Sequence, residues 1–244
     1  MTQRPVELGL RENLAQFSLL VALNAFVGAM VGLERSTLPL IGQSDFGLAS
    51  KAAVLSFIVA FGLAKAITNL SAGVLAQRLG RRRLLIAGWA IALPVPLLIA
   101  VAPSWGWIVA ANVLLGINQG LAWSMTVVMK IDLVGPARRG FALGLNEAAG
   151  YGGVALAAAV SGWLASEIAP RDVLVAAGAG IAVIALILSV MFVRDTAAHV
   201  ALEQERHAGG DERTPSLGEA FADASWREPA LRACSHSDSA AGGC

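Results

Sequence analysis

The sequence has few charged residues, few aromatic residues and almost no cysteine for its length. Only 14% of its 244 residues are charged and 6% are aromatic, whereas about 25% of the residues in a soluble domain are charged. Cys234 and Cys244 are the two cysteines, and both lie near the C-terminal end, so they provide no disulfide framework and no cluster with metal-site spacing. The formal net charge of +1 gives no basic field for binding nucleic acid.

Motifs for cofactor chemistry are also missing. The sequence contains no glycine-rich phosphate loop and no zinc-protease motif, so we expect neither a cofactor nor a metal ion. What the sequence has in abundance is apolar residues, which make up 56% of the chain and give it a mean hydropathy of +0.66. The apolar residues are concentrated before residue 194. This composition predicts an all-α integral membrane protein with a polar C-terminal segment.

Six apolar runs are long enough to cross a bilayer as helices, since about twenty helical residues span the hydrocarbon core. The first run has a longer apolar core than a signal peptide and no small-residue cleavage site, so we expect it to be retained as a span. Pro94 and Pro96 predict a kink in the third run. Polar loops are expected between the runs, the longest at residues 34–51 and 130–140. The six expected transmembrane helices cover residues 14–33, 52–77, 84–102, 107–129, 141–166 and 173–193.

The distribution of lysine and arginine predicts the orientation of these spans. Six spans place both ends of the chain on one side, and ten basic residues near the span ends fall on that side against three on the other. Because loops rich in Lys and Arg stay in the cytoplasm, we expect both termini to be cytoplasmic in a cell (inner or plasma) membrane. The ten are Arg4, Arg11, Arg78, Arg81, Arg82, Arg83, Lys130, Arg138, Arg139 and Arg194; the three are Arg35, Lys51 and Arg171.

The two polar ends of the chain are expected to lie outside the bundle. Residues 1–13 form a short cytoplasmic segment, and residues 194–244 form a cytoplasmic tail with too few apolar residues to build a core. Within the tail, the spacing of apolar residues over 216–231 predicts a short interfacial helix. Residues 235–244 are small and polar, which predicts disorder.

The densest positive charge lies between the second and third expected spans, at residues 73–83. It follows a pattern of Gly, three residues, Asp, a basic residue, any residue, Gly and two basic residues, except that Gln77 replaces the Asp. With this pattern placed among six spans, the sequence resembles the major facilitator superfamily of secondary transporters, which carries it in the loop between spans two and three. The matching residues are Gly73, Arg78, Gly80, Arg81 and Arg82.

The resemblance implies a fold, an activity and a gate. Members of this family have twelve spans in two halves and move small solutes by alternating access, and residues 14–195 resemble the first half. The region of Asp132, Arg138 and Arg139 resembles the loop after span four, where an acid and an arginine pair with the signature loop when the cytoplasmic gate is shut. Because Gln77 lacks the charge of the family's Asp, either the closed gate is weaker or Asp132 interacts more strongly with Arg78, Arg81 or Arg138.

Two charged residues stand inside the expected spans. Lys65 lies near the middle of the second span, where a charge costs about 2.5–3.5 kcal/mol, so its side chain should face protein or water. It is either a site for substrate or counter-ion, or a lysine bonded to a neighbouring helix. Glu147 is the only acid in an expected span and is either a proton carrier or a structural partner of the arginine loop. Their depths differ by about 8 Å, so direct contact between them is not expected.

Polar and small residues share one face of the fourth expected span, and a similar stripe follows the first. Since spans one and four line the central cavity in the family, the resemblance implies that these residues form the wall of a solute pathway. The alternative is close helix packing, in which small residues let backbones approach and Asn donates a hydrogen bond. The stripes consist of Asn112, Gly116, Gln119, Gly120 and Trp123, and of Asn24, Gly28 and Gly32. A third stripe, Gly140, Gly144, Ala148 and Gly152 on the fifth span, predicts packing.

The sequence therefore predicts a transporter of an unidentified small solute, with proton coupling if Glu147 carries protons, and not an enzyme, because Lys65 and Glu147 have no nucleophile, metal or cofactor motif nearby. Three hypotheses concern the chain itself. It is a truncated product of a longer gene, or a half-transporter that pairs with a second six-helix half (from the same gene, a separate chain or a second copy). Otherwise it is a non-transporting membrane scaffold whose tail recruits a partner.

Overall fold

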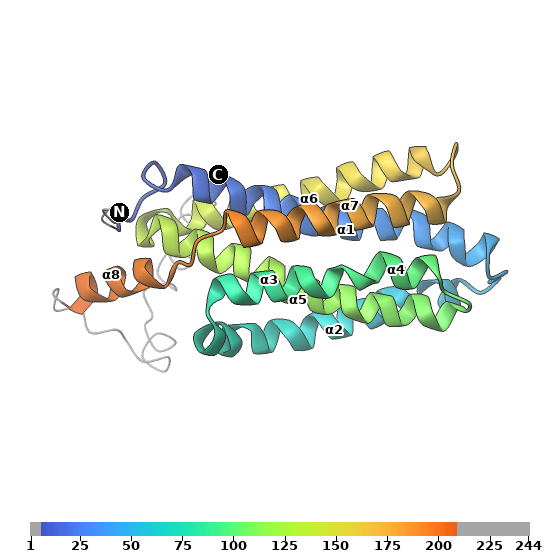
Figure 1. Cartoon of the computed structure of the whole chain (residues 1–244), viewed down its shortest axis with the longest axis horizontal. Coiled ribbons are helices and arrows are strands. Elements are labelled where there is room, and N and C mark those ends of the chain that lie inside the picture. The colour runs from blue at the N-terminus through green and yellow to red at the C-terminus, as the bar shows by residue number, and fades with distance from the viewer. Residues whose placement is uncertain (1–5, 209–244) are drawn as a thin grey trace, which may run out of the picture. The chain divides into compact units, whose positions relative to one another are not determined.

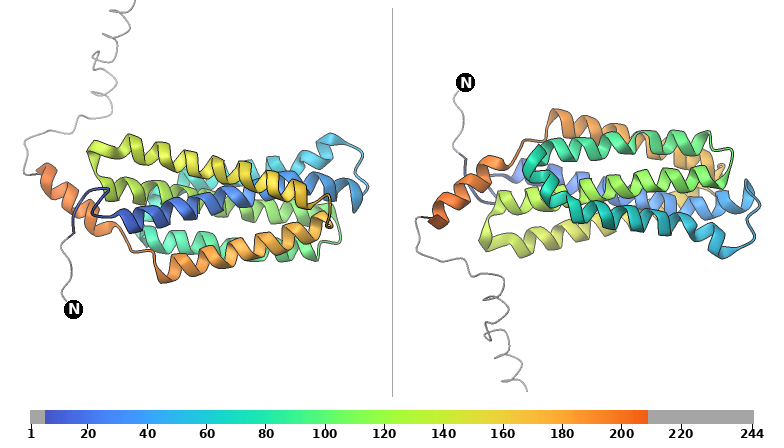
Figure 2. Two further views of the ribbon diagram at one scale, coloured as in Figure 1. Left: turned by 90° about the horizontal axis from the view of Figure 1, so that it is seen from above. Right: turned by 90° about the horizontal axis from the view of Figure 1, so that it is seen from below.

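The computed structural model describes residues 6–208, and every regular element in that range is helical (Figure 1). Helices α1 to α7 form a bundle in which α3 and α4 follow one another in one line, and the other short connections alternate between the two ends of the bundle (Figures 1 and 2). The helix and the disorder expected within 216–244 lie outside the described residues. The elements are α1 (Leu14–Ser44), α2 (Lys51–Leu79), α3 (Arg81–Ala92), α4 (Pro94–Ala100), α5 (Trp105–Val134), the 3-10 turn η1 (Pro136–Arg138), α6 (Arg139–Leu164), α7 (Pro170–Met191) and α8 (Ala197–Ala208).

Five helical segments in the described range are long and apolar enough to cross a membrane. They are α1, most of α2, the pair α3 and α4 taken together, α5 and α7. Helix α6 has 26 residues, which is also long enough, but it contains Asn146, Glu147 and several glycines and is not among the five. The all-helical class expected from the sequence is thus confirmed, whereas the count of six spans stays a prediction.

Helix α1 is longer than the sequence suggested. It continues to Ser44, so the polar loop expected over 34–51 is reduced to residues 45–50. The polar residues of this extension are accommodated inside the bundle, since Glu34 and Thr37 are both buried and the Thr37 hydroxyl donates to Leu33 O at 2.7 Å. An acid that we expected at a loop is therefore part of a packed helix.

Helix α5 likewise runs past its expected end. It ends at Gly135, whose φ of 71° is a conformation that suits glycine at a helix terminus. Lys130 and Asp132 are buried residues of this helix and not of a loop, and Lys130 Nζ donates to Leu20 O at 3.5 Å. The expected third span is interrupted at Leu93, just before Pro94, which has no N–H to continue the helical hydrogen bonds.

Glycines bring two helix pairs into backbone contact. A Cβ on Gly28 of α1 would overlap the carbonyl oxygen of Gly150 in α6, and one on Gly116 of α5 would overlap Phe61 O in α2. One turn further on, a Cβ on Gly32 would overlap Val154 O in α6, and one on Gly120 would lie 2.5 Å from the Thr68 Cβ in α2. The glycines of the stripes on the first and fourth expected spans therefore pack helices together, which was the alternative to a cavity wall.

The two contacts are related by an internal repeat. Asn24, Gly28 and Gly32 have the same spacing as Asn112, Gly116 and Gly120. Helix α1 packs most extensively on α6, and α5 packs most extensively on α2. Exchanging the first three expected spans for the last three turns the contact of α1 with α6 into the contact of α5 with α2. Transporters built from structural repeats show this kind of relation. The glycines of the third stripe have open space where a Cβ would be, so they make no packing contact within the described bundle, and the packing expected of them stays a prediction.

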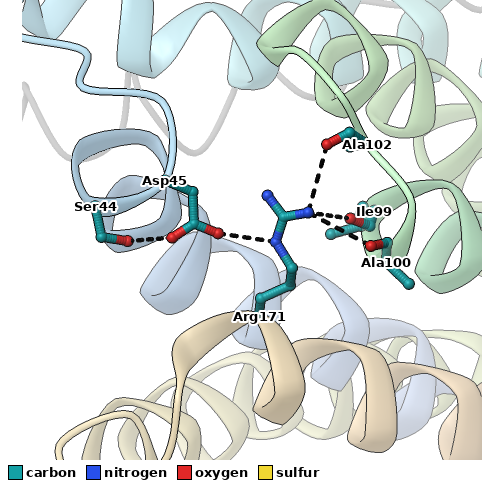
Figure 3. A network of polar contacts seen from close by, with 6 residues as sticks. All are labelled: Ser44, Asp45, Ile99, Ala100, Ala102 and Arg171. Carbon is teal, nitrogen blue, oxygen red and sulfur yellow. Dashed lines mark hydrogen bonds and ion pairs between the residues drawn. The ribbon is translucent and has the colours of Figure 1, made fainter.

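At the end of the bundle away from the arginine-rich segment, one arginine joins three helix ends (Figure 3). Arg171, in the first turn of α7, binds Asp45 just after α1, with 2.8 Å between Nε and Oδ2. Its Nη1 donates to three carbonyl oxygens at the end of α4, a helix end that favours positive charge. Its guanidinium also lies 5.3 Å from the centre of the Phe46 ring. The three acceptors are Ile99 O at 3.3 Å, and Ala100 O and Ala102 O at 3.4 Å.

We expect Gly28→Ala to destabilise the bundle by about 1–3 kcal/mol, because the added methyl group meets a backbone oxygen that no side-chain rotation can move. The measurement is the unfolding midpoint of the purified chain in detergent. Gly144→Ala is the matched control: its position is helical, exposed and open, so the midpoint should stay or rise. Equal effects of the two variants would show that α1 and α6 are not in backbone contact.

We expect Arg171→Lys to lower the free energy of unfolding by about 1–2 kcal/mol, because a lysine keeps the charge near Asp45 but cannot also reach the α4 carbonyls. Asp45→Asn should cost less, since that ion pair is partly exposed to solvent. The two variants are compared by the same detergent unfolding measurement. The carbonyl contacts contribute nothing if Arg171→Lys unfolds at the midpoint of the unchanged chain.

Candidate functional site

The segment with the signature pattern is a tight turn and not an extended loop. Gly80 alone separates α2 from α3, with a φ of 87° that favours glycine. Gly73, Gln77 and Arg78 belong to α2 and are exposed. The three arginines that follow Gly80 form the first turn of α3, and we call residues 80–83 the arginine turn.

Asp132 contacts the arginine turn directly. Its Oδ2 lies 2.7 Å from Arg81 Nε, while Arg78 and Arg138 are exposed. Of the three partners left open by the sequence, the structure places Arg81 against this acid. The Thr196 hydroxyl donates to the same Oδ2 at 2.5 Å, so the carboxylate of Asp132 is held from two sides.

The other basic residue expected at this end, Arg139, pairs with Glu203 of α8. Glu203, Thr196 and Asp195 were not expected at the site. Their positions in the sequence give no signal, because only the folded chain shows that the segment after α7 crosses the ends of α3, α5 and α6.

Halfway along the bundle, Trp123 lies between the two charged residues that the sequence singled out. Lys65 Nζ is 4.8 Å from the centre of a Trp123 ring, and Trp123 Nε1 donates to Glu147 Oε1 at 3.1 Å. Tyr151 packs edge-on against Trp123 with 5.7 Å between ring centres. No ion pair within 4.0 Å joins Lys65 to Glu147. The Trp123 indole therefore lies between the two charged side chains, an arrangement that their expected difference in depth along the helices did not predict.

Gln119 completes this group. Its Oε1 accepts from Lys65 Nζ at 3.5 Å and its Nε2 donates to Val27 O of α1 at 2.5 Å. Gln119 is fully buried, whereas Lys65, Trp123 and Glu147 are half-buried and Tyr151 is 65% exposed. The group therefore opens onto the surface of the described bundle. We call it the aromatic cluster; its members are Lys65, Gln119, Trp123, Glu147 and Tyr151.

The two asparagines expected on the solute pathway lie elsewhere, inside the helix packing. Asn24 is fully buried, donates to Asn146 O at 2.6 Å and accepts from the Thr126 hydroxyl at 3.0 Å, so it links α1, α5 and α6. Asn112 is 1% exposed and donates to Ile108 O of its own helix at 3.1 Å. Neither residue belongs to the aromatic cluster.

Sequence reasoning missed Glu34 because it placed this acid in a loop. Glu34 is 2% exposed, and neither carboxylate oxygen has a well-aligned hydrogen-bond partner in the described structure. Asn112 and Arg35 line the same cavity of about 10 Å³, roughly the space that one water molecule needs. The helical spacing of Leu38 and Ile41 after Glu34 was a signal that α1 continues.

No cluster of His, Cys, Asp or Glu within residues 6–208 has the three or more members needed to hold a metal ion. The polar groups described above therefore offer charge, hydrogen bonds and an aromatic surface.

Comparisons with known proteins identify a matching family and a similar fold. The sequence profile described as Major Facilitator Superfamily matches residues 14–237. The fold is similar to that of XylE, described as a proton:xylose symporter of this superfamily and solved with 6-bromo-6-deoxy-D-glucose bound. The TM-score is 0.65 at 18% sequence identity, over 82% of this chain and 49% of XylE.

The chain thus spans about half the length of that relative. A search of curated proteins found no match. The profile covers most of the chain, including all the helices expected to cross the membrane and the arginine turn. On this evidence the chain, with its all-helical membrane fold, belongs to the Major Facilitator Superfamily.

Proposed function

We propose that this chain forms one wall of a pathway that carries a small polar solute across the cell membrane. The observation that carries the proposal is the aromatic cluster, which opens onto the bundle surface halfway along the helices. Charged side chains at this depth are unfavourable against lipid, so Lys65 and Glu147 should face water or protein. An aromatic surface flanked by one cation and one carboxylate can hold a solute by stacking and by hydrogen bonds.

Of the residues expected on the pathway, Lys65, Gln119 and Trp123 fit this role, and Asn24 and Asn112 fit it less well. Asn24 already uses its amide to join helices and Asn112 donates to its own helix, so a solute would have to break those hydrogen bonds to reach the two buried side chains. Glu147 joins the pathway through its hydrogen bond with Trp123. Tyr151 extends it toward the open surface.

A second six-helix half would supply the opposite wall. The chain covers 49% of XylE, and a second half from the same gene, a separate chain or a second copy would enclose the aromatic cluster between two bundles. Alternating access would then follow from one half rocking against the other. In this arrangement the arginine turn and Asp132 form part of the gate at the basic end, which the excess of Lys and Arg places in the cytoplasm.

Glu34 is a better candidate for the proton carrier than Glu147. The carboxylate of Glu147 accepts hydrogen bonds from Trp123 and Asn146, which stabilise its charge. Glu34 is almost completely buried and neither of its carboxylate oxygens has a well-aligned donor, so an ionised carboxylate there is costly and proton uptake removes the cost. Arg35, Asn112 and the apolar residues of α2 line the cavity beside Glu34. The description of XylE as a proton symporter supports coupling to protons.

Cysteine accessibility tests the pathway in a background with Cys234 and Cys244 replaced by serine. We expect Lys65→Cys to react with a water-soluble thiol reagent roughly tenfold faster than Val59→Cys in membranes, because the reactive thiolate needs water. Val59, in the same helix, is 71% exposed on the bare bundle and should face lipid. Asn112→Cys should also react slowly, being buried. Equal rates at positions 65 and 59 would place the cluster against lipid and remove the basis for the pathway.

Infrared spectroscopy tests the proton site. The chain in lipid should show the carbonyl band of one buried, protonated carboxyl group over the pH range in which it stays folded. Glu34→Gln should abolish that band, and Glu147→Gln should leave it unchanged. Loss of the band in the Glu147 variant alone would assign the proton to Glu147, and its absence from the unchanged chain would rule out a buried neutral acid.

A further inference from the structure

Helix α3 begins in an electrostatically unfavourable way. Its first three residues are arginines, at the helix end that already carries partial positive charge. No acid lies in its first turn, and Gly80 before it provides no side chain to cap the free backbone N–H groups. Stabilisation of this end must come from another part of the chain.

Asp195, which follows α7, supplies it. Its Oδ2 accepts a hydrogen bond from the backbone N–H of Arg82 at 3.2 Å, and its Oδ1 accepts from Ala197 N at 2.8 Å. The Arg82 guanidinium in turn donates to Val190 O, in the last turns of α7, at 2.7 Å. A Cβ on Gly80 would lie 3.4 Å from Asp195 Oδ2, so the carboxylate sits directly at the turn. Asp195 therefore does for α3 what an N-cap residue does within one helix.

The next residue acts on the other side of the same turn. Thr196 is 1% exposed, and its hydroxyl donates to the Asp132 oxygen that binds Arg81 Nε. This donor fixes the orientation of the carboxylate, so that its charge points at the first arginine of α3. Two consecutive residues thus hold the backbone of the arginine turn and the acid that pairs with it.

We propose that Asp195 and Thr196 are positioning residues for the arginine turn: Asp195 caps α3 from outside the helix, and Thr196 orients Asp132 toward Arg81. The contacts tie the end of α7 to the start of α3. The arginine turn can leave Asp132 only when the segment that follows α7 also lets go. The gate role of this turn rests on the function proposed above, whereas the two contacts do not.

Hydrogen–deuterium exchange of the full chain in lipid tests the cap. We expect Asp195→Ala to speed amide exchange in the first turn of α3 by roughly five- to tenfold, as loss of an N-cap should. Asp195→Asn should give a smaller increase, because an amide oxygen still accepts the hydrogen bond without the charge. Asp172→Asn, which changes an exposed acid in the first turn of α7, is the matched control and should leave this exchange unchanged.

Modification of arginine by phenylglyoxal, mapped by mass spectrometry, tests Thr196. We expect Thr196→Val to raise the modification rate of Arg81 several-fold, because Asp132 is then free to turn away, and Thr196→Ser to keep the original rate. The capping role of Asp195 is wrong if the amides in the first turn of α3 exchange equally fast in Asp195→Ala and Asp172→Asn. The orienting role of Thr196 is wrong if Arg81 is modified equally fast in Thr196→Val and Thr196→Ser.

Circular dichroism and elution volume identify variants that have lost the fold. If Asp195→Ala unfolds, the amide exchange rate of Asp195→Asn decides whether Asp195 caps α3. Neither readout uses a solute or a pH gradient, so a negative result here overturns the positioning roles alone. A closed pathway at Lys65 would overturn the proposed transport function and leave these contacts standing.

Discussion

Direct contact between helix backbones is the constraint on which the rest of this bundle depends. Lipid chains are as apolar as leucine, so helices in a membrane gain little from apolar contact alone and associate through close packing and hydrogen bonds. Gly28 and Gly116 provide the packing, because each lies against a carbonyl oxygen of the partner helix. The short distance also lets Asn24 reach the backbone of α6. Asn24 and Gly28, one turn apart, therefore act together at the contact of α1 with α6, and the same residue spacing recurs at Asn112 and Gly116 in α5.

Polar residues on one helix can have different roles. Asn112 and Gln119 lie on one helix and both are buried, yet Asn112 bonds its own backbone while Gln119 reaches both α1 and Lys65. The first is enclosed within the helix packing, at 1% exposure. The aromatic cluster keeps partly exposed polar groups, and that difference distinguishes a residue that joins helices from one that can meet a solute.

Much of this could be predicted from the sequence, because long apolar runs and clustered arginines are local signals. The class and the approximate helix positions followed from them, whereas the importance of Arg81 and Asp132 was implied by the resemblance to the transporter family. Glu34 was missed because a charged residue normally ends an apolar run, and only the packing of α1 shows that this one is buried. Asp195 was missed for another reason: its contact with Arg82 spans 113 residues of sequence, and no local pattern reports such a distance.

The guanidinium of Arg171 has a consequence for how this sequence can change over time. One side chain serves the ends of α1, α4 and α7 together, so no single neighbouring substitution can replace what it does. A change at Arg171 releases Asp45 and several carbonyls at once, whereas a change at Asp45 leaves the carbonyl contacts in place. The order of substitution therefore matters. Losing Asp45 first leaves the arginine and its carbonyl contacts in place, whereas losing Arg171 first produces the less stable intermediate.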